Sequence, residues 1–554
     1  MRPFIYSLLY KKLTPFILCS LDFPYSLGGS MIKQIFLALV LFMNLAHCSD
    51  KTPQILHLNI AGEPDSLDPR VSNNINASFV INTLFQGLTE VNSDGTISYA
   101  LIDSVDLSKD RKTYTFHLKK TNWSDGKPVT AADFEFAWKS CLDPKKAVPC
   151  ANLLYPVKNA EAAKRGDLPL DKVGVKAKDS YTFVVELEQP VPFFLDLVAA
   201  TIFFPVPKHQ VEKDPSWGSR ADIVVNGPFK IAQWDHNREI TVVRNPLYWD
   251  AESVKIDQMK IGMISHEPTA LQMFNTEKLD FIGGDYSPLP LDAIPNLKKQ
   301  GSLQKADYGG TRYCALNTNE FPFNNLNIRK AFSIAVNRQK LVDNITYCDD
   351  EPATGMICSV FKNNQRSSLF PDGDIALAKK HLEMGLKELN IKPEDLNITL
   401  KYENSEITSR IAQAMQQQWL DALGVKVKLE AGELKTFVDS LRRRSFQMGL
   451  IYWMLHYNSP MDIMDRYRSK ELLKNYPGWE NQTYTQLLDD YFTESDVVKQ
   501  KEILNRAEAI FIADMPVIPL FHFSRPFLCK SELKGVQVTP IGDIFLNRAY
   551  LDKE

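Results

Sequence analysis

The stretch Asn122-Trp-Ser-Asp-Gly-Lys-Pro-Val-Thr-Ala-Ala-Asp133 constrains the fold more tightly than any other part of this chain. Asp125-Gly126 predicts a tight turn, because glycine accepts backbone conformations that other residues avoid. Thr130, followed three residues later by Asp133, predicts a helix N-terminus of the capping-box type. Just upstream, Tyr114-Thr-Phe-His-Leu118 alternates apolar and polar residues, as a half-buried strand does. A strand, a turn and a helix are therefore expected in quick succession.

Strands and helices continue to interleave on both sides of this stretch. Residues 56–60 alternate apolar and polar side chains and predict an early strand. Gly424 is suited to end a helix, and residues 425–429 alternate as the strand after it. That helix is predicted from apolar side chains that recur at every fourth residue, namely Ile411, Met415 and Trp419. The whole pattern predicts an α/β fold.

Length and charge narrow the class of protein. The chain has 554 residues, more than one hydrophobic core accommodates, which predicts about two or three domains. Its 64 basic and 67 acidic residues leave a formal net charge of −3. A nearly balanced charge argues against a general affinity for nucleic acid.

Motifs that carry catalysis are missing from the sequence. It contains no Gly-x-Ser-x-Gly elbow, no His-Glu-x-x-His, no phosphate-binding loop and no dinucleotide-binding glycine fingerprint. The 9 histidines do not cluster, and no Cys/His spacing is typical of a zinc site. We therefore predict that the protein is not an enzyme and holds neither a cofactor nor a metal.

The N-terminal region has the pattern of an export signal. Lys33 precedes the apolar run at residues 35–43, and small residues follow before the sequence turns polar. The run is too short for a comfortable membrane span. We expect residues 1–48 to be the signal region, with Met31 as the true start. A genuine N-terminal extension is the alternative.

Leu45-Ala-His-Cys48 resembles a bacterial lipoprotein box, in which Cys48 carries the lipid. His47 departs from the small residue usual at its position, so lipidation is left open. Beyond Cys48 the sequence has no further apolar run of membrane-spanning length. We expect an exported, periplasmic protein that is soluble or held to the membrane only by a lipid at Cys48.

Six cysteines follow the signal region, and four of them form two pairs close in sequence. Cys141 with Cys150, and Cys348 with Cys358, lie near turn residues. In an oxidising compartment a disulfide could close a loop in each case. Separate buried thiols are the alternative, and the spacing does not decide between them.

Six groups of residues, taken in order, resemble the extracellular solute-binding protein family that includes the oligopeptide-binding proteins. The resemblance runs from about residue 56 to the end of the chain. It is carried by residues 62–69 with 84–88, 123–134, 226–229, 244–249, 317–319 with 323–331, and 418–425. Each match is modest alone, and their common order gives them weight.

This resemblance implies a two-lobed periplasmic binding protein, type II-like and of the large cluster C form, with an extra subdomain and a ligand cleft between the lobes. Such proteins deliver cargo to the permease subunits of an ATP-driven importer and do no chemistry; we expect a monomer. The implied division is 50–85, 206–308 and 523–554 for lobe I, 86–205 for the extra subdomain, and 309–522 for lobe II. Hinge strands would then cross near 308–311 and 521–523, where Gly309 and Gly310 could relieve φ restrictions or form a plain turn.

The resemblance also points to a ligand site at Trp453-Met-Leu-His-Tyr-Asn458. In the oligopeptide binders the corresponding segment carries an aspartate that pairs with the ammonium group of the peptide. Trp453, Tyr457 and Asn458 keep that pattern, but His456 replaces the aspartate. A neutral imidazole accepts one hydrogen bond and supplies no charge. Asp462 and Asp465 could substitute for the missing charge, or could be ordinary solvated acids.

Three further positions bear on the site. Leu434 stands where related binders carry a tryptophan, so one aromatic wall of the cleft is expected to be missing. Arg442, in the run Arg442–Arg444, could meet a ligand carboxylate or lie on a solvated face. The predicted ligand-binding residues are Trp453, His456, Tyr457, Asn458, Asn317 and Arg442.

Two kinds of cargo are compatible with the sequence. Short oligopeptides, bound mainly through their backbone, agree with the retained Trp453, Tyr457 and Asn458. A specialised ligand such as a murein tripeptide, glutathione or a metal complex agrees better with the changes at His456 and Leu434. A chaperone-like or adhesive role is not supported by a closing cleft.

Overall fold

The computed structural model describes residues 53–72, 74–361 and 368–552. Residues 54–554 form one compact unit. The predicted signal region, the start at Met31 and the lipid site at Cys48 lie outside the described residues. Among the described residues, no helix combines the length and the apolar character needed to cross a membrane.

The first sheet has four strands and begins with the predicted early strand. Its order is β1 (Ile55–Ile60), β10 (Gln258–Met263), β9 (Glu239–Arg244) and β8 (Phe229–Asp235). β1 pairs with β10 in parallel, and the other pairs are antiparallel. Nearby helices in this part of the chain are α3 (Ile75–Leu84), α8 (Glu267–Asn275) and α9 (Ile294–Gln300).

A second four-stranded sheet lies within the segment expected to be the extra subdomain. Its order is β4 (Ile102–Leu107), β5 (Thr113–Leu118), β7 (Thr182–Glu186) and β6 (Val175–Ala177). The helices here are α4 (Ala131–Cys141), α5 (Ala160–Arg165), α6 (Phe194–Leu197) and α7 (Lys208–Val211). The predicted strand at 114–118 is β5, and the predicted capping box of Thr130 and Asp133 starts α4.

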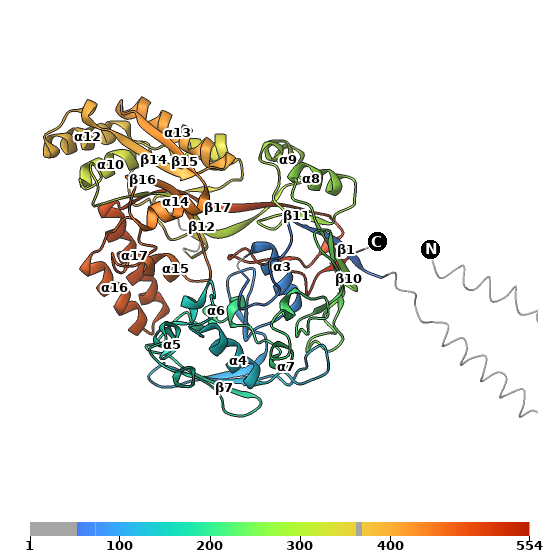
Figure 1. The fold of residues 1–554 in the computed structure, drawn as a ribbon. Coiled ribbons are helices and arrows are strands. Elements are labelled where there is room, and N and C mark those ends of the chain that lie inside the picture. Colours follow the sequence, from blue (N-terminus) through green and yellow to red (C-terminus); the bar gives the residue numbers. More distant parts are fainter. Residues whose placement is uncertain (1–52, 73, 362–367, 553–554) are drawn as a thin grey trace, which may run out of the picture. The chain divides into compact units, whose positions relative to one another are not determined.

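The third sheet has seven strands and carries most of the remaining helices (Figure 1). Its order is β11 (Phe281–Gly283), β17 (Val517–Cys529), β12 (Gln304–Leu316), β16 (Met448–Met454), β14 (Ile398–Glu403) and β15 (Val427–Gly432), with β13 (Glu351–Pro352) paired to β17. Its helices are α10 (Leu326–Ile334), α11 (Arg338–Leu341), α12 (Ile375–Leu389), α13 (Glu406–Leu423), α14 (Leu434–Arg442), α15 (Met461–Met464), α16 (Gln482–Thr493) and α17 (Val497–Asp514). α13 and β15 confirm the predicted helix and strand, and Gly424 caps the helix at φ 70°.

Three two-stranded ribbons complete the described strands. They are β2 (Thr89–Val91) with β3 (Ile97–Tyr99), β18 (Leu533–Lys534) with β21 (Tyr550–Leu551), and β19 (Gln537–Val538) with β20 (Ile544–Phe545). The ribbons β18–β21 and β19–β20 belong to the C-terminal segment, which returns to the region of β1 (Figure 1).

Strands β12 and β17 are the long connectors of the molecule, each 13 residues in length. They pair antiparallel, and Figure 1 shows them running between the α8–α9 side and the α14 side. Their register shifts between the pairs Asp307–Ser524 and Thr311–His522. A shift of this kind is a local bend in an otherwise continuous ladder. It falls where the hinge was expected to cross.

Gly309 and Gly310 are needed at this bend for close packing rather than for φ. Both lie inside β12, so they form no turn, and neither has a positive φ. A Cβ on Gly309 would lie 2.2 Å from Leu455 Cδ1, and one on Gly310 would lie 2.8 Å from the Trp453 carbonyl oxygen. The expectation that these glycines relieve φ is therefore corrected: they allow β16 and its continuation to approach β12.

Gln86 joins three of the segments that carry the family resemblance, which are far apart in sequence and in contact in the structure. The side chain of Asn226 exchanges two hydrogen bonds with the Gln86 backbone, accepting from its N–H at 3.1 Å and donating to its carbonyl at 3.0 Å. The side-chain oxygen of Gln86 accepts from Tyr248 Oη and from Trp249 Nε1. Gly227 fits against the backbone of Leu84, which a Cβ would approach to 2.5 Å. Residues 84–88, 226–229 and 244–249 therefore form one buried junction.

The structure pairs neither of the predicted disulfides. Cys141 is fully buried in the last turn of α4, whereas Cys150 lies beside a large cavity near the start of α3. Cys348 Sγ contacts the Thr346 carbonyl, and Cys358 Sγ contacts the Gly310 carbonyl. The four cysteines form no disulfide within the described residues and face different surroundings, which agrees with the alternative of separate thiols. Burial raises the pKa of the Cys141 thiol to about 12.

Candidate ligand-binding cleft

Two large cavities meet in the middle of the described unit. One has a volume of about 570 Å³ and the other about 520 Å³, both within the range of small-molecule sites. Both cavities are lined by Asp285, Arg312, Glu403, Tyr452 and Met454. They therefore form two parts of one cleft with a common junction.

The first cavity draws its walls from segments far apart in sequence. They include residues 69–78 at the start of α3, residues 200–202, residues 434–438 of α14, residues 450–456 of β16 and its continuation, and residues 541–543. These segments come from both expected lobes and from the expected extra subdomain. A cavity with walls from separate segments changes its size whenever those segments move relative to one another.

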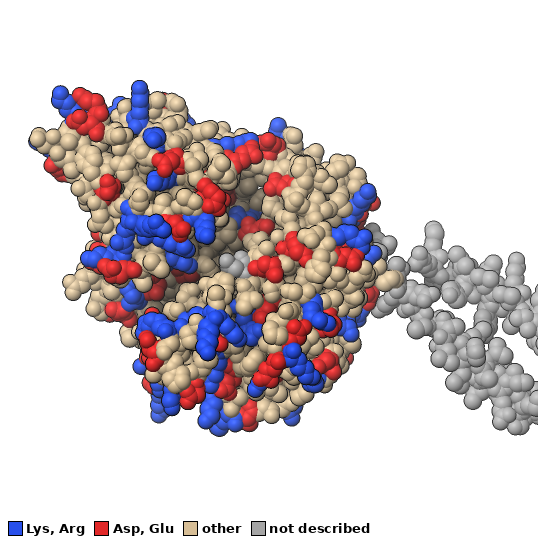
Figure 2. Space-filling view, viewed as in Figure 1, with Lys and Arg blue, Asp and Glu red and all other residues tan. Residues whose placement is uncertain are grey.

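Charges of opposite sign flank this cleft. Figure 2 shows a hollow at the centre of the visible face, with Lys and Arg side chains gathered on its left, over α14 and α15. Asp and Glu side chains gather on its right, below α3. A polar ligand with both a positive and a negative group finds complementary charge at the two sides.

Trp453 forms part of the wall of the first cavity. Its Nε1 donates to Asp462 Oδ2 at 3.2 Å. The Arg466 guanidinium lies 3.6 Å from its ring centroid and Lys474 Nζ lies 4.8 Å away. These cation–π contacts and the hydrogen bond fix the ring in place. Burial beside Arg466 lowers the pKa of Lys474.

His456 also lines the first cavity, with a carboxylate behind it. Asp462 Oδ2 accepts a hydrogen bond from the His456 backbone N–H at 2.7 Å and lies 3.3 Å from ring Nδ1. Asp462 is 8% exposed and lines neither cavity. In the neutral imidazole, an Nδ1–H directed to Asp462 leaves Nε2 as an acceptor. The wall of the first cavity therefore presents an imidazole and not the carboxylate.

The other two predicted residues of this segment are turned away from the cavity. The Tyr457 ring stacks on Phe193 with centroids 5.1 Å apart. The Asn458 side chain donates to the Gly95 carbonyl at 2.8 Å and to Asp196 Oδ1 at 3.1 Å. Neither residue lines either large cavity. Both instead fasten this segment to residues 86–205.

Asn317 and Arg442 are also occupied elsewhere. Asn317 is 3% exposed, and its side chain donates to the carbonyl oxygens of Arg444 and Phe446. Arg442 lies on the exposed face of α14 and pairs with Asp439 at 3.3 Å. Neither is brought to the lining of the two cavities. Asp465 pairs with Arg468 at 2.7 Å and is likewise outside the lining.

The position of Leu434 agrees with the expected loss of an aromatic wall. Leu434 starts α14, is 48% exposed, and lines the first cavity together with Phe437. An apolar side chain exposed in a cavity is available for contact with a ligand. The cleft therefore presents a branched aliphatic group where an indole was expected from the related binders.

Several lining residues could not be found from the resemblance. They include Arg70, Cys150, Asp285, Tyr308, Arg312, Glu403 and Asp543. Arg312 had a usable signal, because a charged residue directly precedes the apolar run 313–316 in a buried part of its strand. The others come from turns and strand ends whose meeting depends on the tertiary fold.

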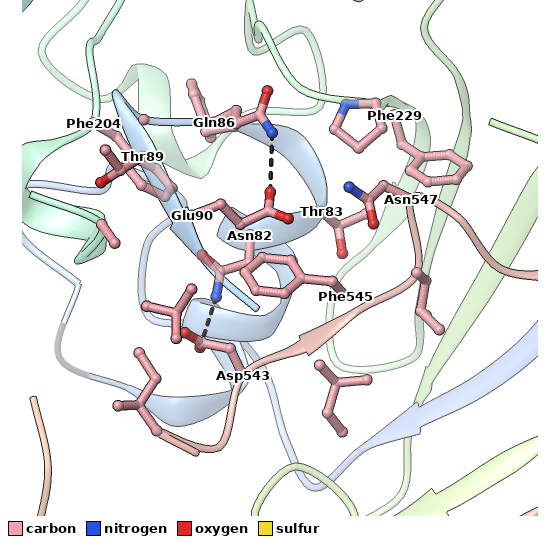
Figure 3. Close-up of a pocket in the computed structure, with 18 of the residues that line it drawn as sticks. Asn82, Thr83, Gln86, Thr89, Glu90, Phe204, Phe229, Asp543, Phe545 and Asn547 are labelled. Atoms are coloured by element: carbon pink, nitrogen blue, oxygen red, sulfur yellow. Dashed lines mark hydrogen bonds between the residues drawn. The ribbon is translucent and has the colours of Figure 1, made fainter. Parts of the chain in front are cut away.

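The described residues contain no cluster of three or more His, Cys, Asp or Glu side chains suited to a metal ion. A small cavity of about 20 Å³ lies next to the first one and shares Asp543 with it (Figure 3). Asn82 Nδ2 donates to Asp543 Oδ1 at 2.8 Å, and Gln86 Nε2 donates to Glu90 Oε2 at 3.0 Å. Burial raises the pKa of Asp543 to about 6 and also raises the pKa of Glu90.

The raised pKa of Asp543 predicts how the stability of the protein changes with pH. Its pKa is raised from 3.8 to about 6, so its contribution to stability is full below about pH 4 and is lost as pH rises through about 6. Asp543→Asn, which keeps the acceptor for Asn82, should therefore raise the melting temperature by about 1–3 °C at neutral pH and by less near pH 5. Differential scanning calorimetry of both proteins across this range measures the difference.

The exposed Asp103→Asn is the matched control and should show no such trend. Because Asp196 also has a pKa of about 6, the difference between variant and wild type is the quantity to compare. A difference that stays constant from pH 5 to neutral would show that Asp543 is not the titrating group.

Known proteins resemble this chain over nearly its whole described length. Residues 96–473 match the family described as "Bacterial extracellular solute-binding proteins, family 5 Middle". The oligopeptide-binding protein OppA of Bacillus subtilis is 38% identical over 502 residues, covering 89% of this chain and 92% of that protein. The structure of Haemophilus influenzae OppA in complex with the peptide RPPGFSPFR has a TM-score of 0.75 at 28% identity, covering 91% of this chain and 100% of that one. The Escherichia coli murein tripeptide-binding protein MppA has a TM-score of 0.74 at 28% identity, covering 91% and 99%.

The fold and the cleft are those of a two-lobed α/β solute-binding protein. The chain belongs to the bacterial extracellular solute-binding proteins of family 5. The resemblance seen in the sequence is thereby confirmed.

Proposed function

We propose that this protein captures short peptides in the cleft at Trp453 and His456 and delivers them to the membrane permease of an ABC importer. The observation that carries the proposal is the paired cavity itself, which combines an anchored indole, an imidazole and separated charges in one cleft. The names of the relatives support it, since they bind oligopeptides or a murein tripeptide. We further propose that the protein does no chemistry on its cargo, acts as a monomer, and has the lobe boundaries expected from the sequence.

Titration calorimetry with tri-alanine tests this function. The protein is first unfolded and refolded so that any cargo carried through purification is removed. We expect one peptide to bind per chain with micromolar or tighter affinity, about −8 kcal/mol or better. Absence of heat and of thermal stabilisation with tri-, tetra- and pentapeptides would refute peptide capture.

A murein tripeptide is a second candidate cargo, supported by His456. The aspartate expected at this position in the oligopeptide binders is replaced, and the nearest carboxylate, Asp462, lies behind the imidazole. Competition between tri-alanine and a murein tripeptide in the same calorimeter separates the two cargoes. Murein tripeptide binding at least about tenfold tighter would favour the specialised role.

His456 predicts weak discrimination of the ligand's amine. A neutral acceptor binds an ammonium group or an amide N–H by one hydrogen bond, which contributes about 0.5–1.5 kcal/mol. N-acetylation of tri-alanine should therefore weaken binding less than about tenfold. His456→Ala should weaken binding of both forms by a similar, severalfold amount.

Calorimetry with the two peptides and two proteins measures this directly. His117→Ala is the control and should change neither affinity, because His117 is exposed, pairs with Asp106 and lines neither cavity. A loss of a hundredfold on acetylation that persists in His456→Ala would show that another group reads the amine.

A further inference from the structure

Arg312 is a buried arginine without a carboxylate partner among the described residues. It lies in β12, and only 6% of the residue is exposed. Its Nη1 reaches Thr408 Oγ1 at 3.5 Å, the outer limit of a hydrogen bond, and its Nε has no partner in the described part of the chain. No carboxylate oxygen of a described residue lies within 4.0 Å of the Arg312 guanidinium nitrogens, the distance that an ion pair requires.

Other buried arginines are satisfied in a different way. Arg338 binds three backbone carbonyls, the Ser333 hydroxyl and Asp372. Arg70 pairs with Asp68, and Arg525 pairs with Asp285. Arg466 also lacks a close carboxylate within the described ranges, but it is covered by Trp453 and lines neither cavity. Arg312 alone among these five combines an unsatisfied guanidinium with a place in the lining of both cavities.

Two aromatic rings pack against the Arg312 guanidinium at the place where the two cavities meet. Its Cζ lies 4.8 Å from the Tyr452 ring centroid and 5.9 Å from that of Phe523. Burial lowers its pKa to about 10, which leaves it cationic at neutral pH. Asp350 accepts from the Ser524 N–H and Asp285 pairs with Arg525, so these nearby acids have other partners. Glu403, which shares the junction, stays beyond ion-pair distance.

An uncompensated buried charge costs several kcal/mol. A ligand that brings an opposite charge to such a group at a cavity wall therefore offsets part of this cost. A carboxylate matches a guanidinium in shape and can accept two parallel hydrogen bonds. We propose that Arg312 binds a carboxylate of the cargo at the junction of the two cavities, as an anchor that sets where the peptide ends or where an acidic side chain lies. This inference rests on the proposed function.

The two sources of a carboxylate are distinguished with three peptides. Tri-alanine carries the C-terminal carboxylate, its C-terminal amide carries none, and the amide of Ala-Glu-Ala carries only that of the side chain. If Arg312 reads the C-terminus, tri-alanine should bind roughly 10- to 100-fold more tightly than both amides. If it reads an acidic side chain, the Ala-Glu-Ala amide should bind more tightly than the tri-alanine amide by a similar factor.

Variants assign the effect to this residue. Arg312→Met removes the charge and keeps most of the volume, and it should bring the carboxylate-to-amide affinity ratio close to one. Arg312→Lys keeps a charge without the two-pronged donor and should leave an intermediate ratio. Arg442→Met is the matched control on the exposed face of α14, and it should keep the wild-type ratio.

The outcomes separate this inference from the proposed function. Peptides that bind with equal affinity with and without a carboxylate would overturn the role of Arg312 while leaving peptide capture intact. A ratio that survives in Arg312→Met would also overturn it. If no peptide binds in any form, the proposed function fails and this inference fails with it. The wild-type comparison alone can overturn the role of Arg312, and Arg312→Lys assigns the effect if Arg312→Met does not fold.

Discussion

Asn226→Ala should lower the free energy of unfolding by about 3–5 kcal/mol, because it removes both partners of the Gln86 backbone. Asn226 is fully buried, so neither the N–H nor the carbonyl of Gln86 would find water in its place. Each buried backbone group left without a partner costs about 1–3 kcal/mol. A loss of this size is a large fraction of the stability of an ordinary domain.

Urea denaturation followed by circular dichroism measures the change. Asn344→Ala is the control, since that side chain is exposed and its one hydrogen bond is local, to the Lys340 carbonyl. The control should differ from wild type by less than about 0.5 kcal/mol. If Asn226→Ala stays within about 1 kcal/mol of wild type, the junction around Gln86 does not hold these three segments together.

Trp453→Ala should reduce peptide affinity by roughly 10- to 100-fold. The indole supplies a broad apolar wall to the first cavity. It also shields Arg466 and donates to Asp462, so its removal loosens the support of His456 as well. Calorimetry with tri-alanine measures the affinity, and the melting temperature shows whether the fold is kept.

Trp453→Phe separates the wall from the hydrogen bond. It keeps an aromatic face over Arg466 but loses the Nε1 donor and part of the ring surface, so its affinity should fall by less than about tenfold. If the folded Trp453→Ala variant binds within about threefold of wild type, the peptide lies elsewhere in the cleft.

Much of the fold was open to prediction because its signals are local. The capping box at Thr130 and Asp133 and the glycine cap at Gly424 depend on residues within a few positions of each other. The order of the family-like segments then gave the fold class. Their shared meeting point at Gln86 was not predictable, because it joins residues more than 130 positions apart.

The candidate site was predictable only in part. Trp453 and His456 line the cavity, but Tyr457 and Asn458 turn toward residues 86–205, and no pattern in the short segment distinguishes the two pairs. Asp462 was proposed as a substitute charge, and the structure sets it behind the imidazole. The role of Arg312 depends on which described acids lie near it, and only the tertiary arrangement reveals that.

The two glycines of β12 also show where prediction from sequence fails. A turn or a φ requirement was the natural explanation of Gly309 and Gly310 from sequence. In the structure their lack of a side chain matters because Leu455 and the Trp453 carbonyl lie against them. Close approach between strands is a property of the assembled sheet and leaves no local signature.

The central claim, capture of peptides in this cleft, is tested most directly by the cargo that the protein carries from the cell. The protein purified without unfolding is analysed by native mass spectrometry, and the released small molecules are then sequenced by fragmentation. We predict a mixture of short peptides bound at up to one per chain, and their loss in Trp453→Ala. A single non-peptide compound bound in that proportion, or peptides that remain fully bound in folded Trp453→Ala, would contradict peptide capture at this site.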